Sequence, residues 1–273
     1  MKFSFLSWNV EHFRGGGERL KRVAAHVRQH DPDIFGLMEI EGADILSLMR
    51  DEFPEHDFSV TDGPEVQEIL VGWRRAKFQQ AIFTQKREFK AFNPSLRPGA
   101  LLSVRLHNQY YNLLFLHTDS GTGAPDFGNR TEMFEKVWKL KKAVDKIGGG
   151  AGEGNLIMLG DLNTMGLAYP TPAKKNQRVT ATDEIHALGV NAETVGLRPL
   201  AKEFDQTWYS THMQSELDHV LASTQLKFVE QGKRADGTPF EVMVRGWNQL
   251  DGDARTAFVS DLSDHSALFA IVK

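Results

Sequence analysis

The segment NLIMLGDLNTMG, residues 155–166, is a short apolar run that ends in a carboxylate and an amide. Four apolar residues, 156–159, lead into Gly160 and predict a buried strand. Asp161 and Asn163 follow it, one position apart. A polar residue after a strand is commonly a turn residue, but strand ends are also where a rigid scaffold holds binding groups. The segment therefore predicts a site only if other strands end in the same way.

Similar apolar runs recur along the chain, each bounded by turn residues, and predict further strands. They are residues 3–8, 33–38, 68–73, 80–84, 100–106, 110–116, 217–222, 240–244 and 267–272. Helical periodicity lies between several of them, at residues 17–30, 43–52 and 130–147. Residues 164–215 are the least regular part. Many strands with interspersed helices predict a mixed α/β layered domain, with two sheets packed face to face and helices outside. We interpret the glycine-rich residues 148–154 as a helix-to-strand loop.

Composition narrows the classes of function. The chain has 273 residues, a net charge of -4 and no cysteine, which excludes disulfides, thiolate metal sites and a cysteine nucleophile. The absence of an apolar run of about eighteen residues argues against a membrane span. The N-terminus lacks the pattern of a signal peptide, so we expect a cytoplasmic protein unless a leader has been removed. A protein that binds nucleic acid by charge alone is strongly basic, and this chain is slightly acidic. Handling phosphates would therefore require a divalent cation.

Polar residues stand at or near the ends of most of these predicted strands. They are Asn9, Glu39, Glu68, His117, Asp161, Asn163, Asp218, Asp264 and His265. Each alone has an ordinary structural explanation, as a turn residue or a satisfied histidine. Together they predict one site at which several strands end.

Six short motifs resemble, in order, those of the endonuclease/exonuclease/phosphatase superfamily. They are WNVE (8–11), LMEIE (37–41), LHT (116–118), GDLNT (160–164), ELDHV (216–220) and SDHS (263–266). The resemblance spans essentially the whole chain. It implies a four-layered α/β sandwich, a single domain over residues 1–273, and hydrolysis of phosphate esters that depends on Mg²⁺, with Mn²⁺ as a possible substitute.

The resemblance also implies roles for the acidic and amide residues. Glu39 and Asn9 are the first metal ligands, with Asp264 as an additional one, since Mg²⁺ prefers oxygen donors. Asp161 orients or deprotonates the attacking water. Asn163 holds the water or a phosphate oxygen without adding negative charge.

Two histidines complete the implied site. By the family pattern His265 is paired with Asp218, and a carboxylate in that position fixes the tautomer and raises the pKa of the histidine. The strand QEILVGWR (67–74) resembles that of pancreatic-type deoxyribonucleases, which makes Glu68 the expected partner of His117. Both histidines would stabilise the transition state. Two supported histidines favour a deoxyribonuclease-like enzyme over an abasic-site endonuclease.

Other residues give hints about the substrate. Asn129 and Arg130 open the helix predicted at 130–147, where family members often contact phosphate with an arginine, and a helix N-terminus favours anions. The basic residues Lys174, Lys175 and Arg178 would overhang the site. Glu11 is either an outer metal ligand or a surface acid, and we favour the surface acid.

The leading hypothesis is a metal-dependent DNA nuclease, with endonuclease-like action on DNA or another phosphodiester and a monomeric chain. The alternative is a phosphatase or phosphodiesterase that acts on a small molecule or lipid head group, of the inositol-phosphate or sphingomyelin type. A catalytically inactive binding module is disfavoured, because a degenerate copy should have lost part of the residue set. The loops at 84–99 and 164–215 would shape the groove that separates nuclease from phosphatase.

Overall fold

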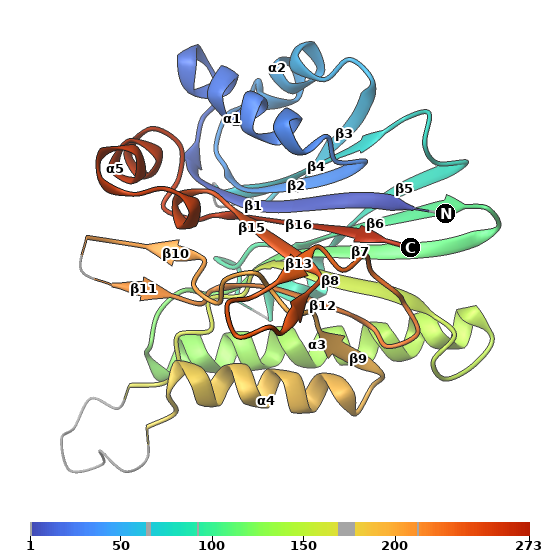
Figure 1. The fold of residues 1–273 in the computed structure, drawn as a ribbon. Coiled ribbons are helices and arrows are strands. Elements are labelled where there is room, and N and C mark those ends of the chain that lie inside the picture. Colours follow the sequence, from blue (N-terminus) through green and yellow to red (C-terminus); the bar gives the residue numbers. More distant parts are fainter. Residues whose placement is uncertain (1, 64–66, 92, 169–177, 212) are drawn as a thin grey trace.

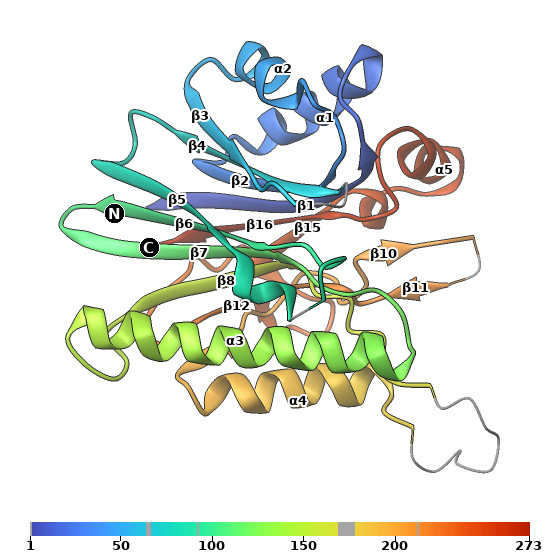
Figure 2. The ribbon, with the colours of Figure 1, turned by 180° about the vertical axis from the view of Figure 1, so that it is seen from behind.

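Two six-stranded sheets pack face to face, with helices on their outer faces (Figures 1 and 2). The computed structural model describes residues 2–63, 67–91, 93–168, 178–211 and 213–273. The layers run helix, sheet, sheet, helix, so the predicted four-layered α/β sandwich is confirmed. The single domain remains a prediction.

The first sheet has the strand order β15-β16-β1-β2-β4-β3. Its strands are β1 (Phe3–Phe13), β2 (Ile34–Ile40), β3 (His56–Val60), β4 (Glu68–Arg74), β15 (Val242–Arg245) and β16 (Ala267–Val272). β1 and β2 are parallel, and the other neighbours are antiparallel. The sheet is therefore mixed, with one parallel pair at its centre.

The second sheet repeats this plan with the order β5-β6-β7-β8-β12-β9. Its strands are β5 (Gln80–Lys86), β6 (Gly99–Leu106), β7 (Gln109–His117), β8 (Asn155–Asp161), β9 (Leu197–Pro199) and β12 (Asp218–Ser223). Its parallel pair is β7 and β8. Two small hairpins are separate: β10 (Trp208–Tyr209) with β11 (Gln214–Ser215), and β13 (Gly232–Lys233) with β14 (Pro239–Phe240).

Helices cover both outer faces. α1 (Gly17–His30) and α2 (Ile45–Glu52) lie over the first sheet, and α5 (Gly252–Asp261) lies beside it, while α3 (Ala124–Gly148) and α4 (Ala181–Glu193) lie over the second (Figure 1). Among the described residues, short 3-10 helices are η1 (Arg87–Lys90) and η3 (Trp247–Gln249). Residues 164–215, expected to be the least regular part of the chain, contain α4 and the short strands β9, β10 and β11. The glycine-rich residues join α3 to β8, as predicted.

The sheets approach closely because their facing side chains alternate in size. Phe115 of β7 lies against Gly36 of β2, where an added Cβ would stand 2.2 Å from the ring. Both residues are buried, and their neighbours Phe5, Ile69 and Leu159 belong to one apolar core drawn from both sheets. Burial of such large apolar side chains contributes about 1.5–3 kcal/mol each. The core thus holds the two parallel pairs against each other.

Candidate functional site

The predicted polar residues meet where the two parallel pairs end. Strand register places His117 of β7 beside Asp161 of β8, and Asp161 beside Asp218 of β12. Gly160, just before Asp161, has a φ of +138°, and an added Cβ would stand 2.0 Å from the carbonyl oxygen of Leu116. Glycine is needed there because an L side chain would be strained and would clash with the neighbouring strand.

Irregular backbone turns Glu39 and its neighbours toward the site. Glu39, Glu11 and His12 have left-handed φ values of 62°, 45° and 48°. They lie where the β1–β2 and β2–β4 registers shift, as in a β-bulge. Such bulges re-aim side chains next to active sites. Strained backbone of this kind costs about 1–3 kcal/mol per residue and persists only where its surroundings fix it.

Asn9 links the two sheets at the site. Its Nδ2 donates to Glu39 Oε1 and to Asp161 Oδ2, each at 3.0 Å. Its Oδ1 accepts from the backbone N–H of Glu11 at 3.0 Å. Two carboxylates from different sheets therefore share one amide group, which offsets part of their repulsion. The amide oxygen of Asn9 faces the backbone in this arrangement.

Asp161 is a buried carboxylate held by several donors. It is 2 % exposed, and its Oδ1 accepts from the backbone N–H of Asn163 at 3.1 Å. Burial raises the pKa of Asp161 to about 7, and the charge of His265 and the hydrogen bond from Asn9 offset only part of this effect. A carboxylate with such a pKa is suited to take a proton near neutral pH. The side chain of Asn163 donates to the carbonyl oxygen of Thr118 at 3.1 Å.

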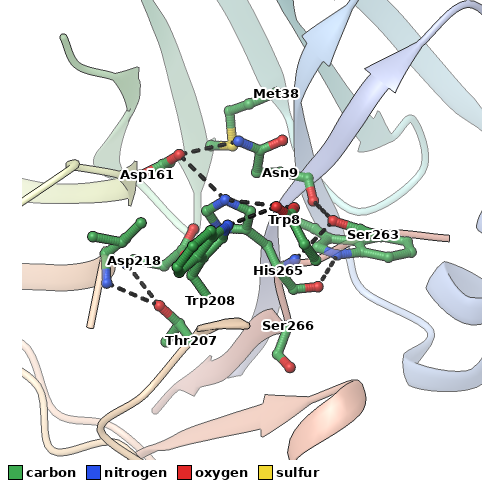
Figure 3. A network of polar contacts seen from close by, with 12 residues as sticks. Trp8, Asn9, Met38, Asp161, Thr207, Trp208, Asp218, Ser263, His265 and Ser266 are labelled. Carbon is green, nitrogen blue, oxygen red and sulfur yellow. Dashed lines mark hydrogen bonds and ion pairs between the residues drawn. The ribbon is translucent and has the colours of Figure 1, made fainter. Parts of the chain in front are cut away.

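His265 and Asp218 form a tight pair. His265 Nδ1 lies 2.8 Å from Asp218 Oδ2, and Nε2 points toward Asp161 Oδ2 at 3.7 Å (Figure 3). Burial opposes a charge on His265, but the carboxylates of Asp218, Asp161 and Asp264 outweigh it and raise the pKa to about 10. His265 is therefore an imidazolium at neutral pH. Trp8 fixes its backbone by donating from Nε1 to the carbonyl oxygen of His265 at 2.9 Å.

His117 has the opposite charge state. Its Nε2 lies 3.7 Å from Asp161 Oδ2 and 3.8 Å from Glu39 Oε1. Burial, together with repulsion from Arg97 and His265, lowers its pKa well below the ordinary value. His117 is therefore neutral. One neutral and one charged histidine flank the same carboxylate.

The expected pairing of Glu68 with His117 is not formed. Glu68 accepts a hydrogen bond from the hydroxyl of Thr61, and Nδ1 of His117 is buried without a hydrogen-bond partner among the described residues. Glu68 begins β4, whose partners are β2 and β3 in the other sheet. The carboxylate of Glu68 is turned toward Thr61, which follows β3. The hydrogen bond between this glutamate and His117 that the family resemblance implies is therefore absent here.

Asp264 and Glu11 stand together at the rim. Asp264 Oδ2 accepts from Trp208 Nε1 at 2.6 Å, and its backbone N–H donates to Glu11 Oε2 at 3.3 Å. Burial raises the pKa of both carboxyl groups. Glu11 lines the pocket, so its expected place on the open surface is wrong.

A pocket of about 320 Å³ is lined by Glu11, Glu39, His117, Asp161, Asn163, Asp264 and His265, while Asn9 and Asp218 lie behind these lining residues. The lining also includes residues that the sequence analysis did not select, namely His12, Gln67, Arg97, Ser120, Met165, Trp208 and Leu217. Arg97 is the notable addition, because it brings a cation whose Nε is buried without a hydrogen-bond partner among the described residues. No sequence signal separates Arg97 from other loop arginines. The sequence indicated only that residues 84–99, the loop between β5 and β6 that contains Arg97, would shape the groove.

The predicted phosphate contact by Arg130 is wrong. Arg130 is fully buried and bonds Glu184 of α4 through Nε at 2.8 Å and Nη2 at 3.0 Å. Its other donors reach the carbonyl oxygens of Asp119, Gly121 and Gly166. Asn129 donates to Asp119 at 2.8 Å. Both residues fasten α3 to its surroundings. Lys174 and Lys175 lie outside the described residues, and Arg178 is exposed.

The donor set fits a hard divalent cation. Glu39 and Asp264 bring carboxylate oxygens to one pocket, with Asn9 and Asp161 adjoining, and Mg²⁺ is bound through such oxygens. Asp161, Asp218 and His265 also have potential ligand atoms within 4.8 Å of one another. The charge of His265 and its bond to Asp218 argue against a cation at that second position. The predicted ligand set is therefore the better fit.

Comparison with known proteins adds the family. The model of the endonuclease/exonuclease/phosphatase family matches residues 6–265. The chain belongs to this family. In sequence alone, no curated protein matches it.

Solved structures of family members share the fold. The D. rerio TDP2 complexed with single-strand DNA product is 16 % identical, with a TM-score of 0.65 over 100 % of this chain and 99 % of that one. A truncated C. elegans TDP2 is 16 % identical, with a TM-score of 0.65 over 99 % and 97 %. ANGEL2, described as a 2′,3′-cyclic phosphatase, is 13 % identical, with a TM-score of 0.63 over 99 % and 95 %. Family members are phosphoester hydrolases. Among the described residues, no helix has the length and apolarity to cross a membrane.

Proposed function

We propose that the protein is a Mg²⁺-dependent phosphodiester hydrolase that cleaves DNA. The observation that carries this proposal is the position of Asp161. Its buried carboxylate, with a pKa of about 7, lies 3.7 Å from both neutral His117 and charged His265. A base and two imidazoles around one point suit attack of water on an anionic phosphodiester.

Asn9, Glu39 and Asp264 would hold the cation, with Asn9 presenting its oxygen after rotation of the amide. When bound, Mg²⁺ neutralises phosphate charge and polarises the phosphoryl oxygen. The same three residues also fix the floor of the pocket, because Asn9 bridges Glu39 and Asp161 and Trp208 fixes Asp264.

Asp161 accepts the proton of the attacking water. The backbone N–H of Asn163 orients its Oδ1, which leaves Oδ2 toward the pocket and the two histidines. Asn163 would hold the water or a phosphate oxygen if its side chain leaves the carbonyl oxygen of Thr118.

His265 stabilises the additional negative charge of the pentacovalent transition state. Asp218 keeps it charged and oriented, which avoids reorganisation during the reaction. His117 contributes a neutral hydrogen-bonding group on the opposite side. Arg97 offers a cation to the substrate phosphate, the role that the sequence predicts for Arg130.

The alternative is a phosphatase or phosphodiesterase for a small molecule or lipid head group. ANGEL2 supports it, because that protein with the same fold is described as a 2′,3′-cyclic phosphatase. DNA is favoured by TDP2, which was solved with a single-strand DNA product. An inactive binding module is disfavoured, because Asp161 lies 3.7 Å from each of His117 and His265, and Asp218 lies 2.8 Å from His265.

An activity panel with Mg²⁺ tests the proposal. It compares plasmid DNA and single-stranded DNA with a chromogenic bis-phosphodiester, a phosphomonoester and sphingomyelin. We expect cleavage of DNA and of the bis-phosphodiester, lost on chelation. Intact DNA with turnover of a monoester or lipid would replace the proposal with the alternative. Activity that survives chelation would refute the metal dependence.

A further inference from the structure

The connection between β5 and β6 concentrates positive charge. Residues 86–98, KREFKAFNPSLRP, contain four basic residues and one acid, although the whole chain has a net charge of -4. Lys86 pairs with that acid, Glu88, at 2.6 Å. Arg87, Lys90 and Arg97 form no ion pair with the described residues, and Lys90 interacts at longer range with the carboxylate of Glu68.

Two of these cations line a groove. One hollow of about 490 Å³ is lined by Arg87, Glu88, Lys90, Asn93, Pro94 and Lys136, and a second of about 420 Å³ by Asp62, Gly63, Gln85, Arg87 and Lys90. The two hollows share Arg87 and Lys90 and are together named here the basic groove, whose lining also includes the acids Glu88 and Asp62. The side chains of Arg87 and Lys90 make no hydrogen bond or ion pair with the described residues.

The basic groove adjoins the catalytic pocket. Gly63 lies in the groove, and its Cβ position is 2.8 Å from Glu68 Oε1 and 3.7 Å from Pro98 Cδ. Gln67 and Arg97, the chain neighbours of Glu68 and Pro98, line the catalytic pocket. A ligand that leaves the pocket past Arg97 would therefore pass Gly63 and enter the groove that Arg87 and Lys90 line.

We propose that the basic groove binds the phosphodiester backbone of a polynucleotide strand beyond the cleaved bond. The inference rests on the proposed function and names its substrate class as a strand rather than a small ester. A strand carries one negative charge per nucleotide, and cations that neutralise successive phosphates release bound counterions. A small ester or a lipid head group ends inside the pocket and leaves these cations unused. The groove also supplies the local basic surface that the overall charge of the chain lacks.

The test measures binding separately from turnover. The probe is a fluorescein-labelled single strand of about twenty nucleotides, kept intact in the Asp161→Asn background, with anisotropy recorded over a salt series. Arg87→Gln/Lys90→Gln is compared with Lys139→Gln/Lys142→Gln, which removes two charges from the exposed face of α3. A labelled dinucleotide serves as the short probe.

We expect the groove variant to bind the strand about 10-fold or more weakly, with the slope of log Kd against log salt shallower by about 1.4, from about 0.7 per phosphate contact. Its loss on the dinucleotide should be much smaller, and the α3 variant should bind the strand as the parent does. An equal loss of strand affinity in both double variants, or no loss in the groove variant, would refute the proposed binding of the strand in the basic groove. Turnover of the bis-phosphodiester by the unmodified protein tests the proposed function separately. This substrate is too short to occupy both the catalytic pocket and the basic groove.

Discussion

Asp218→Asn tests the electrostatic account of the site, because the change keeps the shape of the side chain and removes its charge. The pKa of His265 stands at about 10 against an ordinary 6.5, which corresponds to about 5 kcal/mol in favour of the imidazolium. Asp218 is the largest contributor that opposes burial. Without it, the pKa of His265 should fall from about 10, because burial is then opposed only by the carboxylates of Asp161 and Asp264. We expect kcat/KM to fall by about 10²–10³-fold, the cost of losing one preorganised donor to the transition state.

The assay is kcat/KM on the bis-phosphodiester with Mg²⁺ from acid to strongly alkaline pH. Activity that needs the imidazolium is lost as pH rises through its pKa, so the alkaline limb should move from near pH 10 toward neutrality. The fold should persist, because Thr207 accepts from the backbone N–H of residue 218, which the change leaves in place. Asp253→Asn, an exposed acid on α5, is the matched control. Wild-type kcat/KM with an unchanged alkaline limb would refute the assigned role of Asp218.

Three further predictions concern other residues. Arg130→Met should lower the free energy of unfolding by about 3–5 kcal/mol in urea denaturation, because buried Glu184 loses its partner. Most of the lost stability should be recovered in Arg130→Met/Glu184→Leu. Unchanged stability of Arg130→Met would contradict the structural role of Arg130. Burial and the neighbouring His30 lower the pKa of His26 to about 4. Up to about 3 kcal/mol of stability should therefore be lost as pH falls from 6.5 to 4. His26→Leu should flatten that part of the pH–stability curve, and an equally steep curve in this variant would exclude His26 as the cause. Arg97→Gln should lower kcat/KM by about 10-fold or more, the value of a hydrogen bond to a charged group; kinetics like those of the wild type would remove Arg97 from the phosphate site.

Much of the fold follows from local pattern. Apolar runs bounded by turn residues predicted ten of the twelve strands in the two large sheets, and β3 and β9 were missed. A polar residue at or near most of the predicted strand ends indicated where a site would lie. Asp161, Asp218 and His265 meet because the strand register makes residues distant in sequence into neighbours. The pattern of polar residues at strand ends predicted one shared site, and the family resemblance assigned roles and partners to its residues.

The errors arise where geometry depends on distant partners. The helix expected at 130–147 begins at Ala124, so Arg130 stands in its second turn and faces Glu184, 54 residues further along the chain. That partner lies on α4, a helix that was not predicted within residues 164–215. The Thr180–Asp183 capping box was nevertheless a visible sign of that helix.

Glu68 shows a different limit. A residue at the first position of a strand has no fixed direction from the alternation of side chains alone. Here its carboxylate bonds to Thr61. The charge states of His117 and His265 likewise depend on burial and on neighbours from several elements, which the sequence does not contain in any local form.

The most direct test of the central claim compares the wild-type protein with Asp161→Asn in Mg²⁺-dependent hydrolysis of a phosphodiester, at matched folded concentration. The amide preserves the shape of the side chain and removes the base. We predict loss of turnover, with a melting temperature equal to or above that of the wild type, because burying the carboxylate is unfavourable. Near-normal turnover by Asp161→Asn would contradict the account, because the group placed between the two histidines would then not be the base.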